Sequence, residues 1–208
     1  MKKIIVFASL LFTVSLLFAQ SQKVVSDCTV TYSISGADAA ADKSKNLQGA
    51  TKTLYIKGKN VRSDINSSSY NQSIIINNTT GGIVILREIG TNKYMSVLDD
   101  AKWKEQNTKF VGMKITLDSD IKTILGYECK KATAHLANGS ILGLYYAPVI
   151  IPSALENAYQ FNGVPGFVLE YESISDDGKV ITYTANKINL NPVPGIKFEI
   201  PTNGYRIL

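Results

Sequence analysis

The stretch Cys28-Thr-Val-Thr-Tyr-Ser-Ile-Ser35 alternates strictly between larger side chains and the hydroxyl residues threonine and serine. Successive side chains of a β-strand point to opposite faces of its sheet. One face of this stretch therefore carries Cys28, Val30, Tyr32 and Ile34. A strand with one apolar and one polar face is typical of an antiparallel sheet that covers a core on one side.

Short strands separated by turn residues continue along the chain, with no long helical periodicity. Asn138-Gly139 and Asp176-Asp177-Gly178 are the clearest turn signals, and Asn-Gly supplies the positive φ values of a type I′ hairpin turn. The expected strands and hairpins cover 28–35, 51–65 with a turn at 58–60, 73–76, 82–89, 94–98, 114–117, 127–136, 140–146, 166–175, 179–190 and 197–200.

About nine to eleven strands joined by short connections predict a mainly β fold. We expect a single curved antiparallel sheet or open half-barrel with one or two short helices. The best helix candidate is Ser153–Gln160, with Pro152 before it and Ser153 as the N-cap. Residues 99–110 are compatible with a helical turn or an irregular edge, and residues 37–50 read as a loop. The lack of helices between the strands excludes a Rossmann-type fold.

The N-terminus has the order of a secretory signal peptide. Lys2 and Lys3 precede an apolar run from Ile4 to Phe18, and Ala19 offers a small residue for cleavage. This run is shorter than the ~20 residues that span a bilayer as a helix. We therefore expect residues 1–19 to be removed and residues 20–208 to form one exported β-rich domain, periplasmic or secreted.

The charge pattern argues against a nucleic-acid partner. The formal net charge of the whole chain is +5, and it falls to +3 when Lys2 and Lys3 leave with the signal. The remaining basic residues are scattered singly and form no continuous stripe. A mildly basic surface of this kind still favours an anionic ligand or an anionic membrane surface.

The chain has two cysteines, Cys28 and Cys129. In an oxidising compartment an even number permits one disulfide, which makes this pair the disulfide candidate. The alternative is that both are small buried hydrophobic residues that never meet. Sequence alone supplies no Cα distance, so both readings stay open.

Residue patterns for catalysis or metal binding are mostly absent. The single histidine, His135, lies six residues from Cys129 on one expected strand, about 20 Å away, which is too far for a thiol–imidazole pair. One histidine and two distant cysteines do not make a zinc site. Paired carboxylates for glycoside hydrolysis stay open among the seventeen acidic residues. We expect no enzyme activity, no cofactor and no metal.

Two of the expected strands are apolar on both faces. Ser73-Ile-Ile-Ile76 and Ile83-Val-Ile-Leu86 carry consecutive apolar residues, whereas a strand with one wet face would alternate. The second face is therefore covered too, by a helix or lid, or the sheet curves around an apolar cavity. The candidates for a hydrophobic lining, with a plug from the expected helix, are Ile74, Ile76, Val84, Leu86, Met95, Val97, Leu155 and Tyr159.

The C-terminal half resembles a known family. Ile124-Leu-Gly-Tyr-Glu-Cys-Lys-Lys-Ala-Thr133, Leu144-Tyr-Tyr-Ala-Pro148 and Phe161-Asn-Gly-Val-Pro-Gly-Phe-Val-Leu-Glu170 resemble the GLPGLI family of exported Bacteroidota proteins. Gly163-Val-Pro-Gly-Phe-Val168 stands at the place of that family's signature, with Val164, Phe167 and Val168 replacing Leu, Leu and Ile. The ending Phe198-Glu-Ile-Pro-Thr-Asn-Gly-Tyr205 is similar to the terminal strand of the LolA/LolB lipoprotein-carrier superfamily.

The resemblance implies an open, strongly curved sheet with helices on its concave side and an apolar ligand outside the cytoplasm. The main expectation is a non-enzymatic cell-envelope protein that binds a lipid or other hydrophobic small molecule in that concavity. The alternative is a structural or interaction module of the envelope whose sheet edge docks another envelope protein, without a small ligand. The function rests here on analogy of fold.

Overall fold

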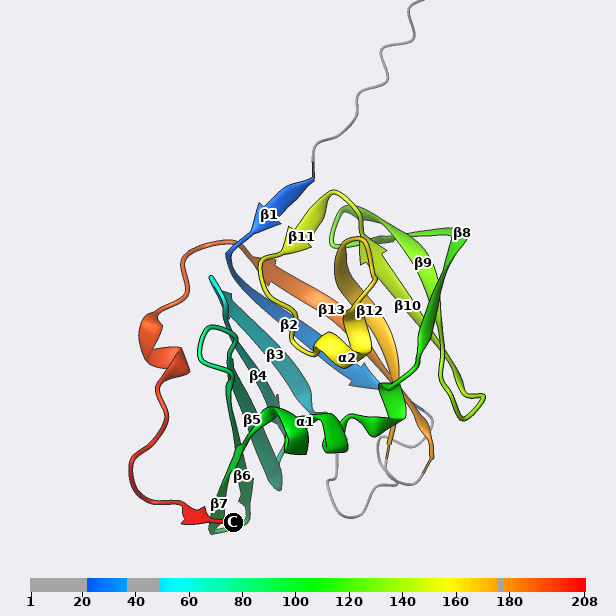
Figure 1. Cartoon of the computed structure of the whole chain (residues 1–208). Coiled ribbons are helices and arrows are strands. Elements are labelled where there is room, and N and C mark those ends of the chain that lie inside the picture. Colours follow the sequence, from blue (N-terminus) through cyan, green and yellow to red (C-terminus); the bar gives the residue numbers. More distant parts are fainter. Residues whose placement is uncertain (1–21, 37–48, 176–177) are drawn as a thin grey trace, which may run out of the picture.

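The computed structural model describes residues 22–36, 49–175 and 178–208 (Figure 1). The strands are β1 (Lys23–Val25), β2 (Asp27–Ser35), β3 (Thr51–Lys57), β4 (Asn60–Asn66), β5 (Tyr70–Asn77), β6 (Gly82–Ile89), β7 (Asn92–Leu98), β8 (Lys114–Ile124), β9 (Tyr127–His135), β10 (Ile141–Ala147), β11 (Ile150–Pro152), β12 (Phe167–Ile174), β13 (Val180–Asn189) and β14 (Arg206–Ile207). The helices are α1 (Asp100–Gln106) and α2 (Ala158–Phe161), with 3-10 turns η1 (Thr108–Phe110) and η2 (Gly195–Phe198).

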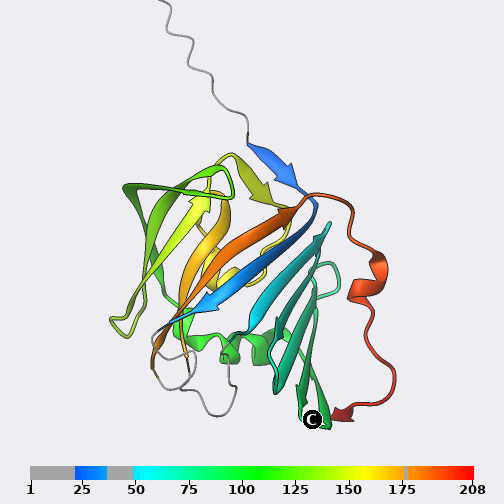
Figure 2. The same ribbon diagram turned by 180° about the vertical axis from the view of Figure 1, so that it is seen from behind.

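Twelve of the described strands form one sheet in the order β14-β7-β6-β5-β4-β3-β2-β13-β12-β10-β9-β8. Neighbouring strands are antiparallel, except that β14 runs parallel to β7. The sheet curves strongly without closing, and α1 and α2 lie on its concave side (Figures 1 and 2). A separate pair, β1 and β11, is parallel. The predicted fold class, a mainly β open half-barrel with short helices, is confirmed.

Alternation along the strands places the core on the concave side. In β2 the residues Cys28, Val30 and Tyr32 are buried, as their spacing predicted. The β3–β4 hairpin turns at Gly58, whose φ of 59° lies in the left-handed region that glycine adopts without steric cost. Leu54 faces the same core, which the arms of this hairpin share with the strands beside it.

The Asn138-Gly139 hairpin forms, but with a different turn from the expected type I′. Among the described residues Leu125 is the single non-glycine with positive φ, so Asn138 does not adopt it. The Gly139 N–H donates to the Leu136 carbonyl at 3.0 Å, and Gly139 has φ 87°. This is a turn followed by a left-handed glycine, the arrangement of a G1 bulge. The expected Asp176-Asp177 turn lies outside the described residues, as do the signal segment and most of the loop at 37–50.

Both faces of β5 and β6 are covered, as their consecutive apolar residues predicted. Ile74 pairs with Ile85 on the concave face, whereas Ile75 pairs with Val84 on the convex face. On the convex side Ile75, Val84, Leu86 and Met95 form a cluster of their own, against which Tyr205 packs. The cover of the second face is therefore the C-terminal segment.

Residues 190–208, called here the C-terminal strap, run along the outside of β4 to β7 (Figure 2). The Arg62 guanidinium donates to the Lys197 carbonyl at 2.8 Å, and the Tyr205 hydroxyl donates to Glu88 Oε1 at 2.6 Å. The hydrogen bond from Tyr205, together with that from Lys93, lowers the pKa of Glu88. The strand expected at 197–200 is wrong: η2 occupies its start, and the strap pairs with the sheet later, through β14.

The helix expected at Ser153–Gln160 is shorter than predicted. The strand β11 extends to Pro152, and residues 153–157 are irregular. The helix α2 therefore begins only after Asn157, whose Oδ1 accepts the Tyr159 N–H at 3.0 Å. The Ser153 hydroxyl instead donates to the Gly58 carbonyl. In α1 the Asp99 carboxylate caps the first turn by accepting the Lys102 N–H at 2.8 Å. Neither described helix has the length and apolar character needed to cross a bilayer.

The two cysteines are free and buried, so of the two readings left open the disulfide between them is contradicted and the buried, unpaired cysteines are found. Cys28 lies on β2 and Cys129 on β9, with β13, β12 and β10 between them in the sheet. Four strand steps of about 4.8 Å each separate their backbones along the sheet by far more than the ~7 Å that a disulfide spans. Burial raises the pKa of the Cys28 thiol to about 12 and that of Cys129 to about 11.

This burial predicts the behaviour of both thiols. Neither should react with a thiol reagent such as DTNB in the native protein, because the attacking species is the exposed thiolate. After denaturation without reductant, two thiols per chain should react, one from each of the two cysteines. Counting released thionitrobenzoate before and after denaturation checks the prediction, and a denatured chain without free thiols would restore the disulfide.

The turn at Gly163-Val-Pro-Gly166 joins α2 to β12 closely. Gly163 has φ 87°, and the Gly166 N–H donates to the Val164 carbonyl at 3.0 Å across Pro165. Gly166 lies directly against β10: a Cβ placed on it would be 2.5 Å from the Ala147 carbonyl oxygen. The segment is therefore a tight structural turn. A larger residue at Gly166 would fit only if the backbone of β10 moved.

Candidate functional site

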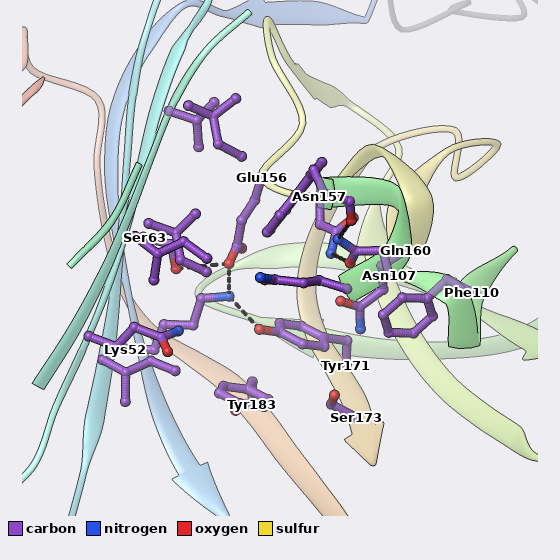
Figure 3. Close-up of a pocket in the computed structure, with 18 of the residues that line it drawn as sticks. Lys52, Ser63, Asn107, Phe110, Glu156, Asn157, Gln160, Tyr171, Ser173 and Tyr183 are labelled. Atoms are coloured by element: carbon purple, nitrogen blue, oxygen red, sulfur yellow. Dashed lines mark hydrogen bonds and ion pairs between the residues drawn. The ribbon is translucent and has the colours of Figure 1, made fainter. Parts of the chain in front are cut away.

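A cavity of about 280 Å³ opens on the concave side, between the sheet and the two helices (Figure 3). It is bordered by β3 to β6 on one side, by β12 and β13 on the other, and by α1, η1 and the start of α2 above. Its described lining consists of Lys52, Val61, Ser63, Ile65, Gln72, Ile74, Ile76, Ile85, Arg87, Trp103, Gln106, Asn107, Lys109, Phe110, Glu156, Asn157, Gln160, Tyr171, Ser173 and Tyr183.

The floor of the cavity is a buried ion pair between Lys52 and Glu156 (Figure 3). Lys52 takes the inward position of β3 that Leu54 and Ile56 take further along, and its side chain is 3% exposed. Its ammonium contacts Glu156 and donates to the Tyr171 hydroxyl. The Ser63 hydroxyl also donates to Glu156 Oε1, at 2.9 Å. The carboxylate and the ammonium therefore satisfy each other.

Three tyrosine rings surround the same ammonium. The Lys52 nitrogen lies 4.8 Å from the ring centre of Tyr171 and 5.3 Å from those of Tyr32 and Tyr183. The negative faces of aromatic rings attract a cation at these distances. Burial lowers the pKa of Lys52, while the ion pair with Glu156 opposes that shift. Burial also raises the pKa of Tyr183 to about 12 and that of Tyr171 well above its usual value.

Two asparagines connect the helices above the cavity. The Asn157 amide donates to Asn107 Oδ1 at 2.6 Å, and Asn107 in turn donates to the Trp103 carbonyl at 2.8 Å. These two hydrogen bonds in series fix α2 against the end of α1. Gln106 and Gln160 extend the amide side of the lining, so most of the groups around the opening form hydrogen bonds without carrying charge.

A second, smaller cavity of about 220 Å³ adjoins the first and shares Ile76, Trp103 and Glu156 with it. Leu155 and Tyr159, the expected plug residues, line this second cavity together with Ile76. They lie on the concave side, as expected, although Leu155 belongs to the irregular segment before α2.

The eight residues proposed for one hydrophobic lining do not share a surface. Ile74 and Ile76 line the larger cavity. Val84, Leu86 and Met95 lie on the opposite face of the sheet under the C-terminal strap, and Val97 lies there too, 59% exposed. The prediction of one shared lining is therefore wrong. Alternate residues of a strand point to opposite faces, and a uniformly apolar run does not show which face each residue takes.

Sequence reasoning missed Lys52, Glu156 and Arg87. A signal existed for Lys52, because it shares the spacing of Leu54 and Ile56 and so belongs to the buried face. No comparable signal marks Glu156, which reaches the cavity from an irregular segment. His135 lies elsewhere, exposed on β9, with a ring nitrogen 3.1 Å from the Thr116 hydroxyl.

Glu156 is the one carboxylate in the described lining of the larger cavity, and it is already paired with Lys52. A pair of carboxylates, as in glycoside hydrolysis, is therefore not assembled in that lining. In the described ranges no three His, Cys, Asp or Glu residues are grouped so as to hold a metal ion.

No protein-family model and no curated protein matches this sequence, so the likeness to the GLPGLI family stays an expectation. Solved structures do show similarity. PNGF-II aligns at a TM-score of 0.49 and 12% identity, over 87% of this chain and 30% of that chain. MucB in the MucA/MucB complex of Pseudomonas aeruginosa aligns at 0.44 and 10%, over 84% and 56%. A separate crystal structure of MucB aligns at 0.40 and 8%, over 85% and 58%.

This chain spans only 30% to 58% of the length of the three structures described. At identities of 8% to 12% and TM-scores below 0.5, these similarities support no function for this chain.

Proposed function

We propose that this protein is an exported, non-enzymatic binding module that holds part of a partner polypeptide in its concave cavity. The observation that supports the proposal is the mixed lining of this open cavity. Its volume of about 280 Å³ lies close to the lower end of the ~300–1,000 Å³ that is usual for small-molecule pockets, and a second cavity of about 220 Å³ adjoins it. The opening leaves room for a side chain or two of a chain that continues outside.

The lining matches a polypeptide better than an acyl chain. Eleven of its twenty described side chains are polar or charged, and the ion pair of Lys52 and Glu156 lies at its floor. An acyl chain would cover amide and hydroxyl groups without offering them hydrogen bonds, which is unfavourable. A peptide offers backbone hydrogen bonds to the amides and apolar stems to Ile74 and Ile85. The interaction module is therefore preferred to the lipid carrier.

Export and the lack of catalysis are parts of the same proposal. Export is supported by the order of residues 1–19, a basic head, an apolar run and a small residue before Gln20. A binding role without catalysis is supported by the paired state of Glu156, the one carboxylate in the described lining. We propose a periplasmic or secreted location and a cell-envelope protein as partner.

Site-specific photo-crosslinking tests the proposal. Benzoylphenylalanine replaces Gln160, which lines the cavity, or Asn138, which lies in the distant β9–β10 turn. After irradiation of cells that export the protein, the Gln160 variant should be joined to a polypeptide, and the Asn138 variant should not. A lipid adduct at position 160, or a lipid that co-purifies in native mass spectrometry, would overturn the proposal and restore the lipid carrier.

A further inference from the structure

We infer that the cavity selects a carboxylate, carried by an acidic side chain of the bound partner segment. This inference rests on the proposed function and names the chemistry of the group that enters. The residue that leads to it is Arg87, a half-buried guanidinium on β6 that lines the cavity. The backbone of Arg87 pairs with β5 and β7, but among the residues that the structure describes none forms a hydrogen bond or ion pair with its guanidinium.

The sheet register places Arg87 in a row that crosses the concave face. Lys52 pairs with Ile65, Ile65 with Gln72, and Gln72 with Arg87, so these four side chains share one face on four adjacent strands. Three strand steps of about 4.8 Å separate Lys52 from Arg87 by roughly 14 Å along the sheet. Glu156 is paired with Lys52 and accepts from Ser63, and it forms no ion pair with Arg87.

The next carboxylate along β6 does not neutralise Arg87 either. Glu88 follows it directly in the strand and so points to the opposite, convex face. There Glu88 accepts from the Tyr205 hydroxyl at 2.6 Å and from Lys93 at 3.0 Å. In the described lining of the cavity the single carboxylate is Glu156, which Lys52 already holds, so no carboxylate of that lining is left to pair with Arg87.

Gln72 supplies a second donor beside Arg87. The two residues are direct cross-strand partners on β5 and β6, which places their Cβ atoms about 5 Å apart. The Tyr70 hydroxyl donates to Gln72 Oε1 at 2.5 Å, which fixes the amide oxygen and turns the amide nitrogen into the group that remains to donate. A guanidinium and an amide N–H₂ side by side match the two oxygens of one carboxylate.

The next row of the sheet explains why a side chain should carry that carboxylate. Ile74 and Ile85 are cross-strand partners one row further along and line the same cavity. They offer apolar contact to methylene groups while the charged end meets Arg87 and Gln72. A glutamate side chain has this combination, a short apolar stem with a carboxylate at its end. A bare inorganic anion would leave the isoleucines without contact.

An NMR titration tests the inference without knowledge of the partner. The exported protein, labelled with ¹⁵N, is titrated with Ac-Ala-Glu-Ala-NH₂, Ac-Ala-Gln-Ala-NH₂ or inorganic phosphate while the Arg87 Nε–H and Gln72 side-chain signals are followed. The Glu peptide should shift both signals saturably, with the tightest binding of the three. Arg87→Gln should weaken the binding of the Glu peptide roughly tenfold, because loss of a charge-assisted hydrogen bond usually lowers affinity by about that factor. Lys130→Gln, which removes an exposed charge on the face of β9 opposite buried Cys129, should leave binding unchanged.

The outcomes separate this inference from the proposed function. Equal shifts by the Glu and Gln peptides, or no effect of Arg87→Gln, would overturn carboxylate selection while the cross-links from position 160 could still support a bound polypeptide. Tighter binding of phosphate than of the Glu peptide would also overturn it. Absence of any peptide shift at Arg87 and Gln72 would overturn it as well, whatever the cross-linking shows.

Discussion

Gly166→Val is expected to lower the free energy of unfolding by more than about 3 kcal/mol, so that most of the molecules do not fold. A Cβ at this position would lie 2.5 Å from the Ala147 carbonyl oxygen and 2.7 Å from Tyr146 Cδ2. One of these contacts is backbone of β10, which is paired with both β9 and β12. The strand cannot yield without loss of its hydrogen bonds. The soluble yield and the urea midpoint measure the effect.

A matched substitution serves as control. Gly195→Val introduces the same side chain in η2, where a Cβ would meet no atom within 4 Å and φ is not positive. This variant should keep the stability of the parent within about 0.5 kcal/mol, as surface substitutions usually do. Equal stability of both variants would show that the β10–β12 junction is looser than the described contacts, and would contradict the structural role of the turn.

The ion pair beneath the cavity should give the second large effect. Glu156→Gln leaves the Lys52 ammonium buried among tyrosine rings without its counter-charge, and loss of one partner of a buried pair costs about 3–5 kcal/mol. The double variant Lys52→Met, Glu156→Gln should recover most of that loss, because no unpaired charge remains. Urea unfolding of the parent, the two single variants and the double variant measures the coupling.

The pH dependence gives an independent check of the same pair. Burial lowers the pKa of Lys52 below its ordinary 10.5, so the folded chain holds this proton less tightly than the unfolded chain. Stability then rises with pH between the folded and unfolded pKa values. In Glu156→Gln, where the opposing ion pair is gone, that rise should be steeper than in the parent. Additive single effects, or a flat pH profile, would show that Lys52 is solvated.

The sequence predicted the sheet well because alternation and turn residues are local signals. The buried faces of β2 and of the β3–β4 hairpin follow directly from residues such as Val30 and Leu54. The consecutive apolar residues of β5 and β6 also indicated that a second cover exists. They could not show that this cover is the C-terminal strap. A uniformly apolar run does not reveal which residues face which side, and the strand of the strap that pairs with β7, β14, is only two residues long.

The cavity could be predicted less well, because tertiary contacts create it. In the sequence Lys52 is one of many scattered lysines, and only its spacing of two residues from Leu54 indicates that it shares the buried face of β3. Its counter-charge, Glu156, is more than a hundred residues away and lies in a segment whose helical pattern gives way to the extended pairing of β11 with β1. The pattern predicted an apolar concavity, whereas the folded chain places a paired charge at its floor.

The two edges of the main sheet differ in a way that bears on self-association. At one edge β14 lies on the middle of β7, and the Leu208 N–H also donates to the Met95 carbonyl there. At the other edge, within the described chain, β8 pairs only with β9 and carries exposed Leu117 and Ile121. Fibre growth by strand addition needs two open edges on every molecule. β14 is an edge strand of only two residues, whereas β8 has eleven, so strand addition should be favoured at β8 and disfavoured at the β14 edge.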